Sequence, residues 1–287
     1  MTTQLDPTSV ETPGPDAGPL SKAEIEQFWR DGYLLLKGIL SPAEAQLYRQ
    51  RILDILPGDL TIPAEWHVRM GRIKPYRPSG DHTWDTPELL PLFINEKLYT
   101  AMAQLLEFPA LRVFDGSLGL SLRNDADSDN AKSRSQGLHL DCSVPRDVDN
   151  FLFTLQEVQL GGCYYLTDVE PDGGGIHVVP GGHRIVEEEA KGHPRGRQLH
   201  SYWSELEHLE SVEVTGQAGD FAVLHHLMPH GASHNRRPTT RAAMFLRYVR
   251  TDQPYGYGAE PPRAYNAAQL EVMTPLGRRL LGLDPWD

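Results

Sequence analysis

The spacing of apolar positions changes near residue 110 and separates two kinds of predicted element. Before this point, two segments with helical spacing each open on a Ser-x-x-Glu capping box, at 21–24 and 41–44. In such a box the serine oxygen accepts the N3 amide while the glutamate reaches back to the cap. We therefore predict helices from these caps to about Arg30 and about Leu56, and further helix over 87–106.

The remaining apolar runs are short and indicate strands. The run at 33–40 lies between Gly32 and Ser41, and from about residue 111 β-prone runs alternate with Gly, Pro, Asp and Asn. The predicted strands of this second part are 112–123, 138–142, 151–160, 163–167, 175–179, 212–214, 221–225 and 242–250. Two more helices are predicted, at 195–210 and 270–283.

Many short strands at this spacing predict a barrel or a jelly roll, so the expected fold class is mainly β with flanking helices. Residues 1–20 are punctuated by Pro and Gly and predict a flexible tail. Residues 21–287 are expected to form a single domain, because the early helices need the barrel wall to bury their apolar faces. Its expected parts are a helical part at 21–110, a barrel core at 111–250, and a C-terminal tail and helix at 251–287.

Composition narrows the classes of partner. The 287 residues carry a formal net charge of −12 and show no basic cluster typical of a nucleic-acid binder. The first 20 residues lack the basic start and apolar run of a signal peptide, and no stretch approaches a membrane span. Two cysteines, Cys142 and Cys163, are too few for a secreted disulfide framework. We expect a cytoplasmic protein with neither nucleic-acid nor membrane partners; its oligomeric state stays open.

The first candidate chemistry is His139-Leu140-Asp141. Residues i and i+2 of a strand point to one face, so an imidazole and a carboxylate converge there. Two histidines and one carboxylate form a facial triad that suits iron(II) and leaves positions open for substrate and O₂. About one His-x-Asp or His-x-Glu pair is expected by chance in a chain of this composition. A second such pair, His208-x-Glu210, lies in a predicted helix, where the two side chains point in different directions.

A distant strand must provide the third ligand. Four histidines fall within 225–234, and Arg241 follows His230 by eleven positions. An arginine that points into a barrel needs an anionic partner, because burying an unpaired guanidinium is costly. A dicarboxylate cosubstrate would be one such partner, and a salt bridge to an acidic residue is nearly as good an explanation.

Taken together, these motifs resemble the phytanoyl-CoA dioxygenase family. The matching stretches are His139-x-Asp141, the Gly-rich segment 174–183, and 219–241 with His230 and Arg241, together with the opening at 24–41 and the ending at 275–282. The resemblance spans about 22–283 and implies a double-stranded β-helix, a jelly-roll barrel, that binds Fe(2+) and 2-oxoglutarate.

The resemblance implies a role for particular residues. His139, Asp141 and His230 are the expected iron ligands, and Arg241 is expected to pair with the distal carboxylate of 2-oxoglutarate. A polar residue before the His-x-Asp motif often assists in this family, and Ser121 or Arg123 is the nearest match. Many relatives have Ser two residues after the distal histidine, where this chain has Ala232 followed by Ser233.

The implied activity is that of a 2-oxoglutarate-dependent dioxygenase. It uses O₂, releases succinate and CO₂, and hydroxylates an unactivated C–H bond of a small molecule; desaturation and cyclisation are related outcomes. Halogenases of this kind replace the carboxylate ligand by a small residue, so Asp141 argues against halogenation. Two alternatives are a catalytically silent barrel that only binds a small molecule, and a cupin-like metalloenzyme that does not use 2-oxoglutarate.

Other polar residues of the barrel receive more ordinary interpretations. Only one of His225 and His226 is expected to face the cavity, since neighbours in a strand alternate. His177 and His183 flank a turn and are expected to make structural hydrogen bonds. Arg247 has the strand parity of Arg241 and is a candidate second anion contact, which suits an anionic metabolite or natural-product intermediate as substrate.

Overall fold

A computed structural model describes seven segments of the chain. They are 18–55, 72–73, 87–121, 138–140, 159–191, 208–252 and 265–286. Asp141, Arg123 and Cys142 and most of the N-terminal tail lie outside the described residues. So do residues 151–158 of the strand predicted at 151–160 and residues 195–207 of the helix predicted at 195–210.

The first two helices begin at their predicted capping boxes. Helix α1 (Lys22–Asp31) is capped by Ser21, whose Oγ accepts the Glu24 N–H at 3.3 Å while Glu24 Oε2 accepts the Ser21 N–H at 2.8 Å. Helix α2 (Pro42–Ile55) repeats the arrangement, with the Ser41 N–H donating to the glutamate at 2.7 Å. Both predictions are confirmed, because the capping interactions are local and do not depend on tertiary packing.

The later helices differ more from the prediction. The segment 87–106 is helical as expected but divides into η1 (Pro87–Leu89), α5 (Leu90–Phe93) and α6 (Glu96–Leu106). The predicted helix 270–283 is wrong in extent: the chain forms α8 (Ala267–Val272) and α9 (Pro275–Leu280), and Thr274 caps the second. Helix α7 (Gly182–Lys191) was not predicted, and the described end of the helix predicted at 195–210 is a turn at His208 and a bend at Leu209.

The described strands form two sheets. The larger has the order β1-β7-β4-β9-β3-β2, and the smaller has the order β6-β5-β8. The strands of the larger sheet are β1 (Tyr33–Leu36), β2 (Arg72–Ile73), β3 (Leu111–Ser121), β4 (Gln159–Tyr165), β7 (Phe221–His225) and β9 (Arg241–Arg250). Those of the smaller sheet are β5 (Ile176–Val178), β6 (Val212–Val214) and β8 (His230–Ala232).

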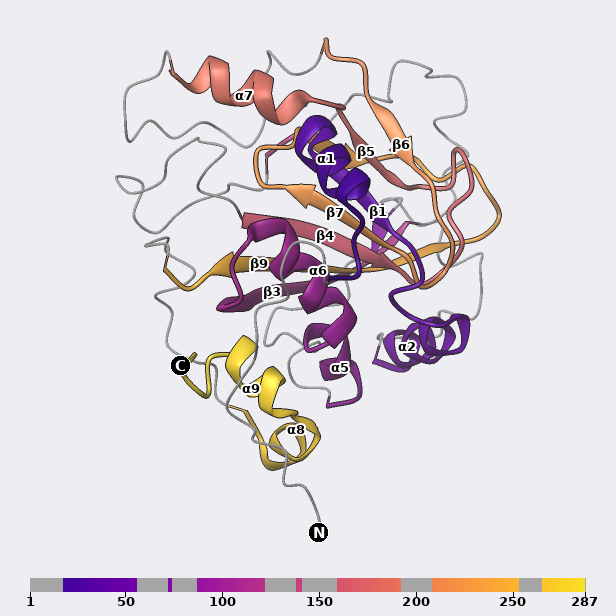
Figure 1. Ribbon diagram of the computed structural model, residues 1–287. Coiled ribbons are helices and arrows are strands. Elements are labelled where there is room, and N and C mark those ends of the chain that lie inside the picture. Colours follow the sequence, from indigo (N-terminus) through magenta and orange to yellow (C-terminus); the bar gives the residue numbers. More distant parts are fainter. Residues whose placement is uncertain are drawn as a thin grey trace.

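Alternation along the large sheet sorts its side chains into two cores. On β9, Met244 and Leu246 face the helices, whereas Ala243 and Phe245 face the small sheet. The helix-side core also holds residues of α1, α5 and α6, and Figure 1 shows α5 and α6 against this sheet. The period of two therefore leaves an inner face between the two sheets.

Tyr165 links the two sheets across the inner core. It lies on β4, it is fully buried, and its hydroxyl donates to Val214 O of β6 at 2.7 Å. The same oxygen accepts the Ile176 N–H of β5 at 3.3 Å. One side chain thus fixes the separation of the sheets next to the inner face of β9.

The turn after α1 gives a stability prediction. Gly32 ends α1 with φ 79°, and a Cβ there would collide with His183 Nδ1 and Met228 Cε. Gly38 also has a positive φ, 61°, but a Cβ there has no neighbour within 4 Å. Gly38→Ala should therefore cost only the left-handed strain, about 1–2 kcal/mol, whereas Gly32→Ala adds overpacking of about 1–3 kcal/mol.

Urea unfolding of the two variants measures this difference. The expected order of midpoints is wild type, then Gly38→Ala, then Gly32→Ala. Equal losses in both variants would show that His183 and Met228 do not pack tightly against the turn.

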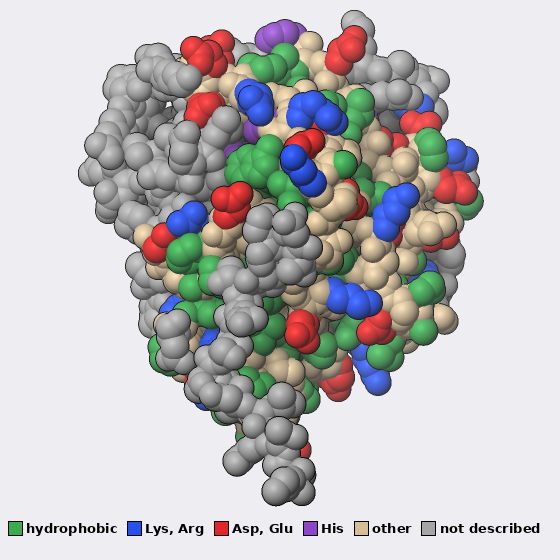
Figure 2. Space-filling view, in the orientation of Figure 1, with side chains coloured by type: hydrophobic (Ala, Val, Ile, Leu, Met, Phe, Trp, Pro, Cys, Tyr) green, Lys and Arg blue, Asp and Glu red, His purple; other side chains and the backbone are tan. Residues whose placement is uncertain are grey.

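The surface view gives no single-sign patch that marks a site. On the face in Figure 2, the described acidic and basic side chains are interspersed. None of the described helices combines the length and apolar character needed to cross a bilayer.

Candidate metal centre and cosubstrate pocket

His139 and His230 come from distant parts of the sequence and lie side by side. The backbone of each residue hydrogen-bonds the other, with His139 N–H to His230 O at 2.8 Å and the reverse bond at 3.0 Å. Their ring centroids are 4.5 Å apart, and both side chains are half-buried. Two imidazoles at this separation can both bind one metal ion through metal–nitrogen bonds of about 2 Å.

The ring of His230 is held in the tautomer that a metal requires. Its Nδ1 lies 2.9 Å from the carbonyl oxygen of Met228. A carbonyl oxygen can only accept, so Nδ1 carries the proton and the lone pair is on Nε2. Metal-binding histidines are commonly oriented by a hydrogen bond of this kind.

The third predicted ligand, Asp141, lies outside the described residues and stays a prediction. Within the described residues, no group of three His, Cys, Asp or Glu side chains is arranged to hold a metal. The flanking residues Leu138 and Leu140 are buried in a small apolar cluster with Val179 and Leu227. They anchor this segment against the β5 and β8 side of the molecule, beside the two histidines.

Arg241 opens β9 and is only 1% exposed. Its Nη2 donates to Ser121 Oγ at 2.8 Å, and the guanidinium carbon lies 5.7 Å from the Phe245 ring centroid on the same face of the strand. No described residue accepts from its buried Nε or Nη1. Burying a guanidinium whose N–H groups lack acceptors costs free energy unless an anion accepts from them. The geometry therefore fits a bound carboxylate.

Ser121 is itself positioned by Asn235, to which the sequence had assigned no role. The Asn235 side chain is 1% exposed, and its Nδ2 donates to Ser121 O at 2.9 Å and to Thr239 O at 2.7 Å. It thus ties the end of β3 to the turn that leads into Arg241. The only sequence signal was its place in the family motif, which does not reveal a backbone partner.

Ala232 stands where many relatives have a serine, but Arg241 still has a hydroxyl partner. Ser233 Oγ donates to Gly175 O at 3.0 Å and lies 2.9 Å from Glu213 Oε1, so it serves the small sheet. Ser121 supplies the hydroxyl at Arg241 instead. Of the two predicted helpers, Ser121 contacts Arg241, while Arg123 lies outside the described residues.

His225 and His226, of which only one was expected to face the metal cavity, adjoin each other at the end of β7. Their rings stack with centroids 4.6 Å apart at 26°, and both line a small pocket with His230 and Arg247. Strand β7 ends at His225, so alternation does not extend to His226. Burial lowers the pKa of His226 to about 3, which keeps its imidazole neutral beside the candidate metal centre.

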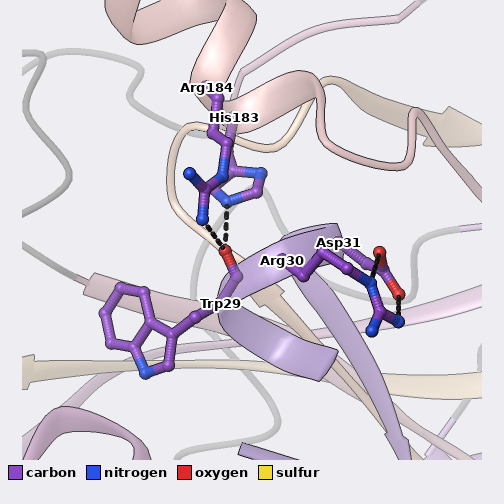
Figure 3. Close-up of polar contacts among 5 residues, drawn as sticks. All are labelled: Trp29, Arg30, Asp31, His183 and Arg184. Atoms are coloured by element: carbon purple, nitrogen blue, oxygen red, sulfur yellow. Dashed lines mark hydrogen bonds and ion pairs between the residues drawn. The ribbon is translucent and has the colours of Figure 1, made fainter. Parts of the chain in front are cut away.

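His177 and His183 make the hydrogen bonds expected of structural residues. His177 Nδ1 lies 3.1 Å from Ser211 Oγ. His183 Nε2 lies 3.2 Å from the Trp29 carbonyl oxygen, which also accepts Arg184 Nη2 at 2.8 Å, as Figure 3 shows. The start of α7 is thus fixed to the end of α1, and the His183 ring packs 5.1 Å from that of His225, one wall of the pocket.

A protein-family model covers most of the chain. The model of the family "Phytanoyl-CoA dioxygenase (PhyH)" matches residues 28–243. No protein among the curated sequences matches significantly.

Several solved structures share the fold. The epimerase SnoN, in complex with Fe3+, alpha ketoglutarate and nogalamycin RO, is 17% identical with a TM-score of 0.56, covering 86% of this chain and 91% of its own. The carbocyclase SnoK from nogalamycin biosynthesis is 20% identical with a TM-score of 0.54, covering 90% and 92%. EctD from S. alaskensis, with 2-oxoglutarate and 5-hydroxyectoine, is 20% identical with a TM-score of 0.55, covering 95% and 94%.

Proposed function

The chain belongs to the phytanoyl-CoA dioxygenase family, and we propose that it is an iron(II)- and 2-oxoglutarate-dependent dioxygenase that oxidises a small molecule. The observation that carries the proposal is Arg241, buried with two N–H directions open beside Ser121. A dicarboxylate cosubstrate explains this arrangement, whereas a cupin-like enzyme without 2-oxoglutarate does not need it. Structural neighbours crystallised with iron and 2-oxoglutarate support the same cofactors.

Each residue of the site has a proposed task. His139, His230 and Asp141 hold the iron, and Met228 O keeps the His230 ring in its binding tautomer. Arg241 binds the distal carboxylate of 2-oxoglutarate, and Ser121 holds the guanidinium in place. When bound, iron with 2-oxoglutarate and O₂ supplies the oxidising equivalents for attack on a C–H bond, and succinate and CO₂ leave.

Hydroxylation is the reaction that we propose for the substrate. The structural neighbours include an epimerase and a carbocyclase, and EctD was crystallised with a hydroxylated compound. This range indicates that one site type serves several outcomes, set by how the substrate lies beside the metal. A carboxylate at 141 occupies the position that a halogenase leaves to halide, so oxygenation is favoured.

The direct test of the reaction uses 2-oxoglutarate labelled at C1. Incubation with iron(II), O₂ and a set of candidate small-molecule substrates should release labelled CO₂ and an equal amount of unlabelled succinate while the second oxygen atom enters the substrate, and chelation of the metal should stop the reaction. Absence of labelled CO₂ from iron-loaded protein with every substrate in the set would favour a catalytically silent barrel that only binds a small molecule.

The hydroxyl at Arg241 gives a graded prediction. Ser121→Ala should weaken 2-oxoglutarate binding by about 10-fold, since a hydrogen bond to a charged group contributes about 1.5–3 kcal/mol and water replaces part of it. Ser233→Ala is the matched control, because its hydroxyl faces Gly175 and Glu213. Anaerobic calorimetry of the iron-loaded variants measures both affinities, and a larger loss in Ser233→Ala would reverse the assignment.

A further inference from the structure

Phe245 lies beside Arg241 on the inner face of β9, and the proposed roles do not use it. The guanidinium carbon of Arg241 lies over the Phe245 ring, 5.7 Å from its centroid, which is within the range of a cation–π contact. The small residue Ala243 lies between the two on the same face. Phe245 is half-buried and packs against the inner core. It is therefore a described neighbour of the guanidinium besides Ser121.

The Phe245 ring does not lie directly over its own backbone partner. The backbone of Phe245 pairs with Ser117 of β3, but a Cβ on Gly119 would lie 2.9 Å from Phe245 Cε2. Gly119 pairs with Ala243, which is one inner-face position closer to Arg241. Aromatic side chains can reach such diagonal neighbours in an antiparallel sheet. The ring therefore leans along the strands toward Arg241.

The absence of a side chain at Gly119 makes room for this position of the ring. The three atoms nearest to a Cβ at this position all belong to the Phe245 ring. Gly119 does not have a positive φ, so the backbone itself does not require glycine here. An alanine at 119 would thus fit the strand and displace the ring.

The guanidinium of Arg241 needs a second contact to fix its orientation. Ser121 Oγ accepts from Nη2 at 2.8 Å, and Nε and Nη1 have no described acceptor. One hydrogen bond restricts a planar group less than two contacts do. Cys163, the backbone partner of Phe245 on β4, supplies no counter-charge, because burial raises the pKa of its thiol to about 12. The ring of Phe245 is placed to restrict the plane of the guanidinium instead.

We propose that Phe245 is a positioning residue for 2-oxoglutarate, whose ring fixes the orientation of the Arg241 guanidinium before the cosubstrate binds. A group that already has its bound orientation loses less conformational freedom on binding. The ring therefore raises the affinity for the distal carboxylate without touching it. This inference rests on the proposed function, because it takes Arg241 as the cosubstrate residue.

The experiment measures 2-oxoglutarate affinity by anaerobic titration calorimetry of iron-loaded wild type, Phe245→Leu, Phe245→Tyr and Gly119→Ala. Leucine removes the ring but stays apolar, tyrosine retains the ring, and alanine at 119 displaces it. Phe221→Leu is the matched control, because Phe221 is a fully buried aromatic residue on the helix side of the same sheet. Iron(II) affinity and Tm are measured for every variant.

Phe245→Leu should weaken 2-oxoglutarate binding by about threefold to tenfold, which is within the range of a desolvated cation–π contact, and should leave iron(II) affinity unchanged. Phe245→Tyr should bind 2-oxoglutarate within about twofold of wild type, since tyrosine makes the same kind of contact. Gly119→Ala should weaken binding by at least about twofold through the displaced ring. Phe221→Leu should lower Tm and bind 2-oxoglutarate as wild type does.

Unchanged or tighter binding in Phe245→Leu overturns the inference, because a ring that only stabilises the cation favours the free guanidinium at least as much as the bound one. An equal loss in Phe221→Leu or in Phe245→Tyr also overturns it, since the loss then comes from general packing. If Phe245→Leu does not fold, Gly119→Ala decides, because it retains Phe245. Unchanged affinity in Gly119→Ala shows that the position of the ring does not matter and overturns the inference.

A double-mutant cycle with Arg241→Ala separates the inference from the proposed function. Without the guanidinium the ring has nothing to position, so adding Phe245→Leu should change the residual affinity by less than about twofold. A further loss as large as in the wild-type background shows that Phe245 acts independently of Arg241 and overturns the inference alone. Normal 2-oxoglutarate binding in Arg241→Ala, or none in wild type, overturns the proposed cosubstrate role and the inference together.

Discussion

Arg241→Ala is expected to weaken 2-oxoglutarate binding by at least about 100-fold while iron(II) still binds with nearly unchanged affinity. The two buried N–H directions of Arg241 that lack a described acceptor would each meet the distal carboxylate. Hydrogen bonds to charged groups contribute about 1.5–3 kcal/mol each, and about 1.4 kcal/mol is tenfold in affinity. Two such bonds account for the expected loss.

The measurement is anaerobic titration calorimetry of iron-loaded protein with 2-oxoglutarate. Arg250→Ala is a matched control, since Arg250 lies on the same strand but pairs with Asp252 at 2.7 Å near the surface. Its 2-oxoglutarate affinity should equal that of wild type. An Arg241→Ala protein that binds 2-oxoglutarate normally would favour the cupin-like alternative, in which Arg241 only supports the fold.

His230→Ala is expected to reduce iron(II) affinity by more than about 100-fold, because losing even a residue that only hydrogen-bonds to a metal ligand costs about 10–100-fold. The residue lies 4.5 Å from His139, ring centroid to ring centroid, and its proton is fixed on Nδ1 by Met228 O. His139→Ala should have a comparable effect. Equilibrium dialysis against iron(II) with metal analysis measures both.

A buried histidine of the small sheet provides the control for this loss. His177 is 5% exposed on β5 and hydrogen-bonds Ser211. His177→Ala should lower the free energy of unfolding but leave iron affinity intact. If His230→Ala and His177→Ala lose iron equally, the effect comes from unfolding of the small sheet and the ligand assignment fails.

Local chemistry explains which elements the sequence could predict. The capping boxes at Ser21 and Ser41 place the starts of α1 and α2, since each needs only residues one turn away. Strands β6 and β7 have their predicted bounds, because polar and Gly-rich turns flank short apolar runs. These features are readable before any tertiary contact forms.

The failures arise where tertiary contacts decide. Helix α7 starts on Gly182, a poor helix former, and is held by the bonds of His183 and Arg184 to the Trp29 carbonyl, about 150 residues away in the sequence. The helix predicted over 270–283 divides because Thr274 caps a new helix that begins at Pro275. That Pro-after-Thr signal was present in the sequence and was missed.

The site was predictable as a set of residues but not as a geometry. The resemblance placed His139, His230 and Arg241 in one site, and the structure brings the two histidines together. It could not show that Asn235 fixes Ser121 or that Met228 O orients His230. Each of these depends on backbone atoms whose position only the fold determines.

The most direct test of the central claim is anaerobic titration of the metal-free wild-type protein with iron(II) and then 2-oxoglutarate, followed by visible absorption. Chelation of the metal by the 2-oxo acid should give a weak metal-to-ligand charge-transfer band that saturates at one equivalent and is absent with succinate. Iron binding without this band would contradict the use of 2-oxoglutarate, and failure to bind iron would contradict the metal centre itself.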